Sequence, residues 1–417
     1  MKSHLRQRGL QWGRPVRIQD DPGIWWEGEA PAEPRLAGRL ALPKHRGFLE
    51  VALVIVVALM ASLWACERQP QRVSAPPQTP KEVAPVPLEL TAAMETYAPE
   101  PVGVKTGTFI DRRQAGDLRV VSYNINWDKI FPDKSQSCAE KFQRVVKALD
   151  PDILNLQEIG STYDEGPKKT LEDVVELMNA IDPRPDGQVW HAYKGASNVI
   201  LSPYPLSMTA DTLDPPSYRD PAMALVDLPD ERFAIDAYVL NNHFKSNSQA
   251  GSQERRQTQA DALVSWLRDA RSPGGKVDLP RNTAIFIVGD LNLVEGPRPL
   301  VTVLTGDIIN EDKYGADAAP DWDGSELTDA HPLHNAVGPD DYTWRDDTSQ
   351  WLPNRLDYVI YSDCVVRDVH KFVLNTTTMS SDELLKARLE KFDVTLDKYG
   401  RKFDHLPVVV DFRVVAP

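Results

Sequence analysis

The chain has 417 residues, 41% of them hydrophobic and 26% charged, a balance typical of a globular protein with a sizeable core. A formal net charge of −14 argues against a protein that binds nucleic acid through a basic surface, although a nuclease whose carboxylates hold cations stays open. Its 3 cysteines lack metal-ligand spacing, which argues against a zinc-thiolate site and a dense disulfide framework.

The first 110 residues differ in composition from the rest. Residues 1–47 are predicted to be a disordered extension, and residues 48–66 contain an apolar run that follows basic residues, as in a signal peptide. Three interpretations stay open: a cleaved signal, a lipoprotein signal with lipid on Cys66, and an uncleaved anchor. Each predicts export to the bacterial periplasm or cell surface. The proline-rich residues 67–110 then predict an extended tether to the membrane.

Strand-like and helix-like segments alternate within the predicted domain, residues 111–417. Apolar periodicity predicts helices at 136–149, 169–180, 252–270 and 382–391. It predicts strands at 118–125, 153–157, 189–193, 198–202, 222–228, 233–241, 284–289, 356–361 and 407–413. Many short strands mixed with helices favour an α/β sandwich of several layers over a simple doubly wound sheet.

The most informative segment follows the apolar strand that begins at Ala284. It ends Gly289-Asp-Leu-Asn, with Asp290 and Asn292 two positions apart. On an extended backbone these two side chains would share a face, where they could hold a hard cation or orient a water. The same residues are also ordinary turn formers, so the motif alone does not decide between a turn and a site.

Polar residues end or border several other predicted strands. They are Asn124, Glu158, His243, Asp357 and the pair Asp404-His405. Each alone has a structural explanation, such as a loop cap, a buried histidine with its hydrogen bonds satisfied, or a local ion pair. Their recurrence at strand ends predicts that they converge at one edge of the sheets.

In this order, the motifs resemble those of the endonuclease/exonuclease/phosphatase family, which includes deoxyribonuclease-I-like, exonuclease-III-like and neutral sphingomyelinase enzymes. The resemblance spans roughly residues 117–414, and it rests on the segments 122–127, 151–158, 198–206, 241–246, 287–292, 342–347, 354–360 and 403–412. It implies a four-layered α/β sandwich, in which two packed mixed β-sheets are flanked by helices.

The resemblance also implies a role for each of these polar residues. Glu158, Asn124 and Asp404 match the metal site, and their oxygen donors suit Mg²⁺ or Mn²⁺. Asp290 matches the aspartate that orients or deprotonates the attacking water. The other implied catalytic residues are Asn292, His243 and the pair Asp357 and His405, and Asn198 is the implied substrate-binding residue. Lys245, two residues after His243, is placed by its position either to bind substrate or to lie in solvent.

The chain departs from the family pattern in several places. Phe403 stands where a serine usually precedes the final Asp-His, residues 375–402 resemble an insertion, and no acidic partner for His243 is evident. Arg255, Arg256 and Gln259 could approach a phosphate, but the prediction favours a solvated basic helix face.

The resulting prediction is an exported, metal-dependent phosphoesterase that acts as a monomer and hydrolyses a phosphodiester or phosphomonoester by in-line attack of an activated water. Its substrate could be nucleic acid, a phospholipid headgroup or a small phosphodiester. The alternative is a non-catalytic binding protein that retains the same fold.

Overall fold

The computed structural model describes residues 105–160, 168–213 and 219–415. The predicted extension, the apolar segment 48–66 and the linker up to residue 104 lie outside the described residues. Within the described ranges, none of the helices has the length and apolar character needed to cross a membrane.

One mixed sheet contains six strands in the order β11-β12-β1-β2-β4-β3, in which only β1 and β2 are parallel neighbours. The strands are β11 (Val366–Val373), β12 (Val408–Val414), β1 (Leu118–Asn124), β2 (Ile153–Gln157), β4 (Asn198–Ser202) and β3 (His191–Gly195).

The second sheet also has six strands, in the order β5-β6-β7-β8-β10-β9, with β7 and β8 as its parallel pair. They are β5 (Leu206–Ala210), β6 (Ala222–Val226), β7 (Ala237–His243), β8 (Ala284–Asp290), β10 (Asp357–Tyr361) and β9 (Thr328–Asp329). The predicted fold of two mixed sheets flanked by helices is therefore confirmed.

Alternate residues of the second sheet pack against different layers. In β8, Phe286 and Val288 join the core between the sheets, whereas Ile285 and Ile287 pack in the cluster beneath a long helix. Phe286 lies with its ring centroid 4.8 Å from that of Phe412 in the first sheet. Burial on both faces explains why the strand reads as a continuous apolar run.

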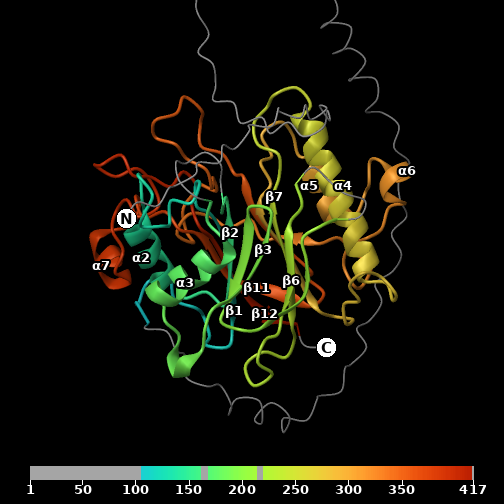
Figure 1. The fold of residues 1–417 in the computed structure, drawn as a ribbon, viewed down its shortest axis with the longest axis horizontal. Helices are drawn as coiled ribbons and strands as arrows, with labels where there is room; N and C mark the ends of the chain where they lie inside the picture. The colour runs from blue at the N-terminus through green and yellow to red at the C-terminus, as the bar shows by residue number, and fades with distance from the viewer. Residues whose placement is uncertain (1–104, 161–167, 214–218, 416–417) are drawn as a thin grey trace, which may run out of the picture. The chain divides into compact units, whose positions relative to one another are not determined.

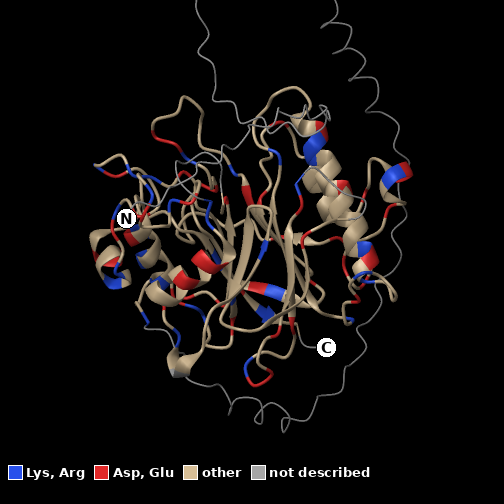
Figure 2. Ribbon diagram, in the orientation of Figure 1, with Lys and Arg blue, Asp and Glu red and all other residues tan. Residues whose placement is uncertain are grey.

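Helices cover the outer faces of both sheets. Figure 1 shows α2 (Ala139–Leu149) and α3 (Leu171–Ile181) on one side, and α4 (Ser252–Ala270) and α5 (Arg298–Thr305) on the other. The short helices are η1 (Pro185–Gly187), α6 (Glu311–Tyr314) and α7 (Ser381–Ala387). Most charged residues lie on helices and loops, while most of the central strands contain few of them (Figure 2).

The folded part begins earlier than the predicted start at residue 111. Ile110 is buried in the main core, and the ring of Phe109 packs edge-on against Phe372 at 5.1 Å. Residues 105–110 therefore belong to the domain, because their apolar side chains pack into it. The unpredicted elements are β5, β9, β11, α5, α6 and η1.

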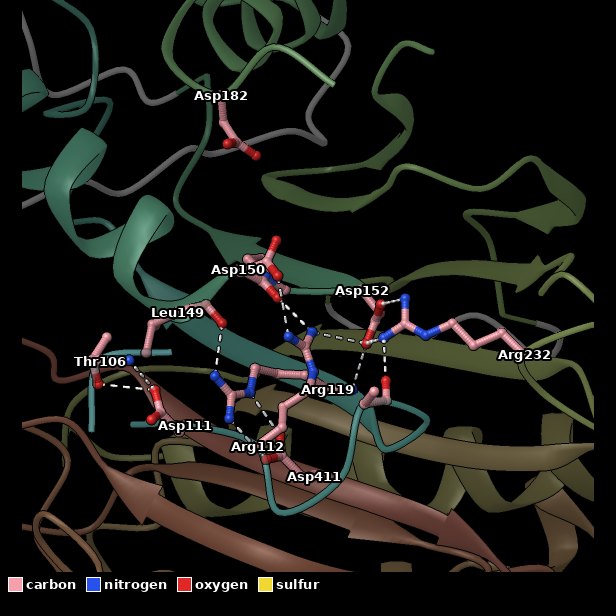
Figure 3. A network of polar contacts seen from close by, with 12 residues as sticks. Thr106, Asp111, Arg112, Arg119, Leu149, Asp150, Asp152, Asp182, Arg232 and Asp411 are labelled. Carbon is pink, nitrogen blue, oxygen red and sulfur yellow. Dashed lines mark hydrogen bonds and ion pairs between the residues drawn. The ribbon is translucent and has the colours of Figure 1, made fainter. Parts of the chain in front are cut away.

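A network of buried ion pairs lies at the start of β1 and β2 (Figure 3). Arg119 donates from Nε to Oδ1 of Asp411 at 2.6 Å and from Nη2 to Oδ2 at 2.8 Å, and both residues are almost fully buried. Arg112 and Arg232 both pair with Asp152, at 3.0 and 2.9 Å. The network joins β1 to β12 through Arg119 and Asp411. It also joins the segment before β1 to the start of β2 through Arg112 and Asp152.

Candidate active site

The polar residues predicted at strand ends lie at the edge of the sheets opposite to that network. Alternate side chains of β7 and β8 point into the core between the two sheets. His243 and Asp290, the last residues of these strands, follow the same alternation and therefore point to the same side. They are register partners, and His243 Nε2 lies 3.7 Å from Asp290 Oδ2. Glu158 directly follows β2, and its Oε1 lies 3.9 Å from the same His243 nitrogen.

Gly289 permits this close approach of β7 and β8. Its φ is +123°, in the region that favours glycine, and a Cβ there would lie 2.0 Å from the carbonyl oxygen of Asn242. A side chain at position 289 would therefore push the two strands apart, just before the residues that face each other in the site.

Asn124 bridges the two carboxylates with its amide nitrogen. Its Nδ2 donates to Glu158 Oε1 at 3.0 Å and to Asp290 Oδ2 at 3.1 Å. Its Oδ1 accepts from the backbone N–H of Asn126 at 3.1 Å, which fixes the orientation of the amide. The predicted metal-ligating oxygen of Asn124 is thus turned away from the carboxylates, and this residue orients Glu158 in the structure.

Burial makes the two bridged carboxyl groups unusually basic. Burial and the neighbouring Asp404 raise the pKa of Glu158 to about 7. Burial also raises the pKa of Asp290 to about 7, even though His405 opposes the shift. Perturbed carboxyl groups packed together at a sheet edge are characteristic of functional sites.

His405 has the opposite electrostatic environment. Burial alone would lower the pKa of His405. The carboxylates of Asp357 and Asp290 outweigh burial and raise this pKa well above its usual value. In this charged form, Nδ1 donates to Asp357 Oδ2 at 2.8 Å, and Nε2 faces Asp290 Oδ2 at 3.6 Å. The predicted Asp357–His405 pair is therefore formed, with its outer nitrogen directed at Asp290.

Thr343 was missed by sequence reasoning, although it organises this pair. Its hydroxyl donates to Asp357 Oδ2 at 2.6 Å and accepts from the backbone N–H groups of Leu356 and Asp357, both at 2.9 Å. The segment 342–347 was recognised as a motif, but nothing in the sequence indicated which strand the hydroxyl would contact.

Replacing Thr343 with valine is expected to lower the free energy of unfolding by about 1–3 kcal/mol, because two buried backbone donors lose their acceptor. It should also lower kcat, since Asp357 loses a hydrogen bond that orients it toward His405. Urea unfolding and steady-state kinetics measure both effects. Thr343→Ser keeps the hydroxyl and should restore most of each loss; equal defects in the two variants would show that the hydroxyl is unimportant.

His243 is held neutral on the other side of the site. Burial lowers its pKa well below the usual value, and the positive charges of Arg219, His405 and Lys245 add to the shift. Its Nδ1 is buried without a hydrogen-bond partner among the described residues.

Asn292 reaches the site by a turn rather than along an extended strand. β8 ends at Asp290, Asn292 has a φ of +49°, and its backbone N–H donates to Asp290 Oδ1 at 3.0 Å. The prediction that the two side chains share a face of an extended strand is therefore wrong. Its Nδ2 instead donates to the carbonyl of Phe244 at 3.3 Å, which keeps it beside His243.

The remaining predicted residues surround this centre. Asn198 begins β4 and donates to the carbonyl of Asp220 at 3.5 Å, while its Oδ1 is buried without a partner among the described residues. Asp404 accepts a 3.4 Å hydrogen bond from Trp344 Nε1 and lies close enough to perturb Glu158. Lys245 is half-buried two residues after His243, beside the basic residue Arg219, which was not predicted.

The donor set fits a hard divalent cation. Glu158 and Asp404 offer carboxylate oxygens, and burial together with repulsion from Asp404 raises the pKa of Glu158 to about 7. A cation between the two carboxylates would offset both effects. A second acidic group, Asp321, Asp323 and Cys364, lies at the opposite edge of the second sheet, past the end of β10. Burial and Asp321 raise the pKa of Cys364 to about 12, so its protonated thiol is a poor ligand.

No curated protein matches the sequence. Among solved structures, a humanized TDP2 from D. rerio aligns at 15% identity over 72% of this chain and 99% of that chain, with a TM-score of 0.43. The human Nocturnin catalytic domain aligns at 14% identity over 72% and 95%, with a TM-score of 0.42. ANGEL2, described as a 2',3'-cyclic phosphatase, aligns at 16% identity over 72% and 96%, with a TM-score of 0.45.

The sequence model of one protein family matches residues 121–382, which is more than half of the chain. The matched range contains Asn124, Glu158, His243, Asp290 and Asp357, while Asp404 and His405 follow it. The chain belongs to the Endonuclease/Exonuclease/phosphatase family.

Proposed function

We propose that the protein is a metal-dependent phosphoesterase that hydrolyses a phosphodiester or phosphomonoester by direct attack of water. The observation that carries this proposal is the pair formed by Asp290 and His405. The pKa of Asp290 is raised to about 7, so it can take up a proton near neutral pH, and it faces a charged histidine at 3.6 Å. Opposed proton affinities in one site are what acid–base catalysis requires.

In the proposed reaction, Asp290 orients a water and accepts its proton as the water oxygen forms a bond to phosphorus. The bond from phosphorus to the leaving oxygen breaks in line with this attack, and the departing oxygen takes up a proton from solvent. His405 and His243 donate hydrogen bonds to the non-bridging oxygens as negative charge develops on them. A Mg²⁺ or Mn²⁺ ion held by Glu158 and Asp404 supplies Lewis-acid charge neutralisation when bound.

The retained polar residues support catalysis over the alternative of a binding protein without activity. Burial and charge repulsion both disfavour the ionised forms of Asp290 and Glu158. A site that only bound a ligand would not require two such carboxyl groups close together. We further propose that the protein is an exported monomer tethered to the membrane through its N-terminus. The apolar run within residues 48–66, followed by the proline-rich segment, supports this part of the proposal.

Activity of the purified protein on three substrates tests the proposal: plasmid DNA, sphingomyelin in mixed micelles, and bis(p-nitrophenyl) phosphate. Hydrolysis is expected with Mg²⁺ or Mn²⁺, and removal of the metal with EDTA should abolish it until the metal is restored. Cleavage of DNA alone would identify a nuclease, and cleavage of sphingomyelin alone a lipid phosphodiesterase. A protein inert on all three substrates with both metals would favour the binding protein instead.

A further inference from the structure

The inner face of α4 holds the segment that follows His243. Gln259 is almost fully buried, and its side-chain amide makes two hydrogen bonds to different parts of the chain. Its Oε1 accepts from the backbone N–H of Lys245 at 2.8 Å, and its Nε2 donates to the backbone carbonyl of Arg219 at 3.3 Å. One buried amide therefore fixes the backbone of both cationic residues.

Arg256, one helical turn before Gln259, holds the same segment from the other side. It is fully buried, and its Nη1 donates to the carbonyls of Lys245 at 2.7 Å and Asn247 at 2.8 Å, while Nη2 pairs with Glu295. The prediction of a solvated basic face is wrong for Arg256 and Gln259, because the chain after β7 folds over this part of the helix. The spacing of three residues puts both side chains on one face.

Arg219 and Lys245 place positive charge beside the otherwise acidic site. Both act on the buried His243, and Arg219 Nη1 also donates to the carbonyl of Phe244 at 3.2 Å. His243 Nε2 also lies 3.9 Å from Glu158 Oε1 and 3.7 Å from Asp290 Oδ2, so the same histidine adjoins both the carboxylates and the segment that carries the cations. A phosphate ester bound beside His243 would therefore be near both the cation-binding carboxylates and the fixed cations.

We infer that Arg219 and Lys245 bind the non-bridging oxygens of the substrate phosphate, and that Gln259 is the positioning residue that holds both cations in place. This inference rests on the proposed function, because it assigns the anionic substrate to the same site. Guanidinium and ammonium groups fixed beside a reacting phosphate stabilise the charge that develops on it. Gln259 itself touches no substrate and acts through the two residues that it holds.

The test compares Gln259→Leu with a matched control on the same helix. Gln257 also uses its amide for two hydrogen bonds, to Asp261 and Thr302, both 2.8 Å long, but neither partner lies in the site. With bis(p-nitrophenyl) phosphate as substrate, Gln259→Leu should raise both KM and the inhibition constant of inorganic phosphate about tenfold. Gln257→Leu should leave both values near those of the wild type.

Direct substitution of the cations separates positioning from a general loss of stability. Arg219→Met and Lys245→Met should each weaken phosphate inhibition about tenfold. In the Arg219→Met/Lys245→Met background, Gln259→Leu should have little further effect on phosphate inhibition. A purely structural Gln259 would lower the unfolding midpoint and leave phosphate inhibition unchanged, which would overturn the inference.

The two proposals fail in different ways. If the wild type hydrolyses its substrate but Arg219→Met and Lys245→Met bind phosphate as tightly as it does, the inference fails alone. If the wild type is inert on all substrates, the proposed function fails. The inference is then tested by binding of inorganic phosphate, followed by ³¹P NMR line broadening in the wild type and the same variants, and equal broadening in all of them would overturn it.

Discussion

Replacing Asp290 with asparagine is expected to lower kcat by about 10²- to 10⁴-fold, the usual contribution of a positioned general base. The amide has nearly the same size and can still accept one of the two hydrogen bonds from Asn124 Nδ2 and the backbone N–H of Asn292, but its nitrogen cannot accept the other, and the amide cannot take up a proton from water. His405 also loses one of the three carboxylates that keep it charged, and Asp357 and Asp404 remain. Steady-state kinetics on the best substrate of the panel measure the loss.

Above pH 7, the same variant should be at least as stable as the wild type in the absence of metal, because removal of a buried charge outweighs the one hydrogen bond that is lost. This result would separate loss of catalysis from loss of fold. Burial raises the pKa of Asp290 to about 7, whereas an unfolded aspartate titrates near 4. Between these values the folded state holds more protons, so wild-type stability falls as pH rises from about 4 to 7. The advantage of Asp290→Asn should therefore be small at pH 4 and largest above pH 7, as measured by thermal unfolding in EDTA.

Asp261→Asn on α4 provides a matched control for this experiment. Asp261 is also buried, and its carboxylate accepts from the backbone N–H groups of Ile309 and Asn310 at 3.1 and 3.0 Å. Its replacement should reduce stability without a comparable fall in kcat. Near-normal turnover by Asp290→Asn would eliminate this residue as the proton acceptor.

Replacing Asp411 with leucine is expected to lower the free energy of unfolding by about 3–5 kcal/mol, because it leaves the buried charge of Arg119 without its partner. The pair is bidentate, and Arg119 also donates to the carbonyl of Leu149 at 2.8 Å. Urea unfolding followed by tryptophan fluorescence measures the change.

The double variant Arg119→Met/Asp411→Leu should recover part of this loss, since no buried charge remains, although the Leu149 carbonyl still lacks its donor. Lys386→Met serves as the control for an exposed ion pair. Lys386 Nζ lies 2.7 Å from Asp382 Oδ2 on α7, and the two side chains are 48% and 70% exposed. Replacing Lys386 should therefore lower the free energy of unfolding by less than about 0.5 kcal/mol. If Asp411→Leu lowered the free energy of unfolding by no more than Lys386→Met does, the Arg119–Asp411 pair would contribute little to stability.

The sequence predicted the strands that end at the site because their signals are local. β8 and β7 are continuous apolar runs followed by polar residues, and the strand ends meet at one edge whatever the loops do. β11 was not predicted, because its buried residues are interrupted by Arg367, Asp368 and Lys371 at the border of the sheet. The helix predicted at 382–391 corresponds to α7, which begins one residue earlier, at Ser381, and ends four residues earlier, at Ala387.

Residues that act through tertiary contacts could not be found in this way. Thr343 contacts Asp357 across 14 positions, and Gln259 joins two segments that are far apart in sequence. Burial decided the role of Arg256, since an arginine on a helix is usually solvated unless other segments of the chain supply acceptors for it. Neither the folding of residues 245–247 over α4 nor the turn at Asn292 could be inferred from periodicity.

The two edges of the sheets have opposite requirements, which has a consequence for engineering. At one edge, the opposite charges of Arg119 and Asp411 attract each other. At the other edge, Glu158 and Asp290 lie close together although burial disfavours their ionised forms. β1 connects the two edges, because Arg119 lies near its start and Asn124, which bridges Glu158 and Asp290, lies at its end. The residues that stabilise the fold and those that form the site are therefore at different ends of this strand. Directed evolution of substrate preference can therefore randomise the loops beyond the strand ends, provided that the ion pairs at the far edge stay unchanged.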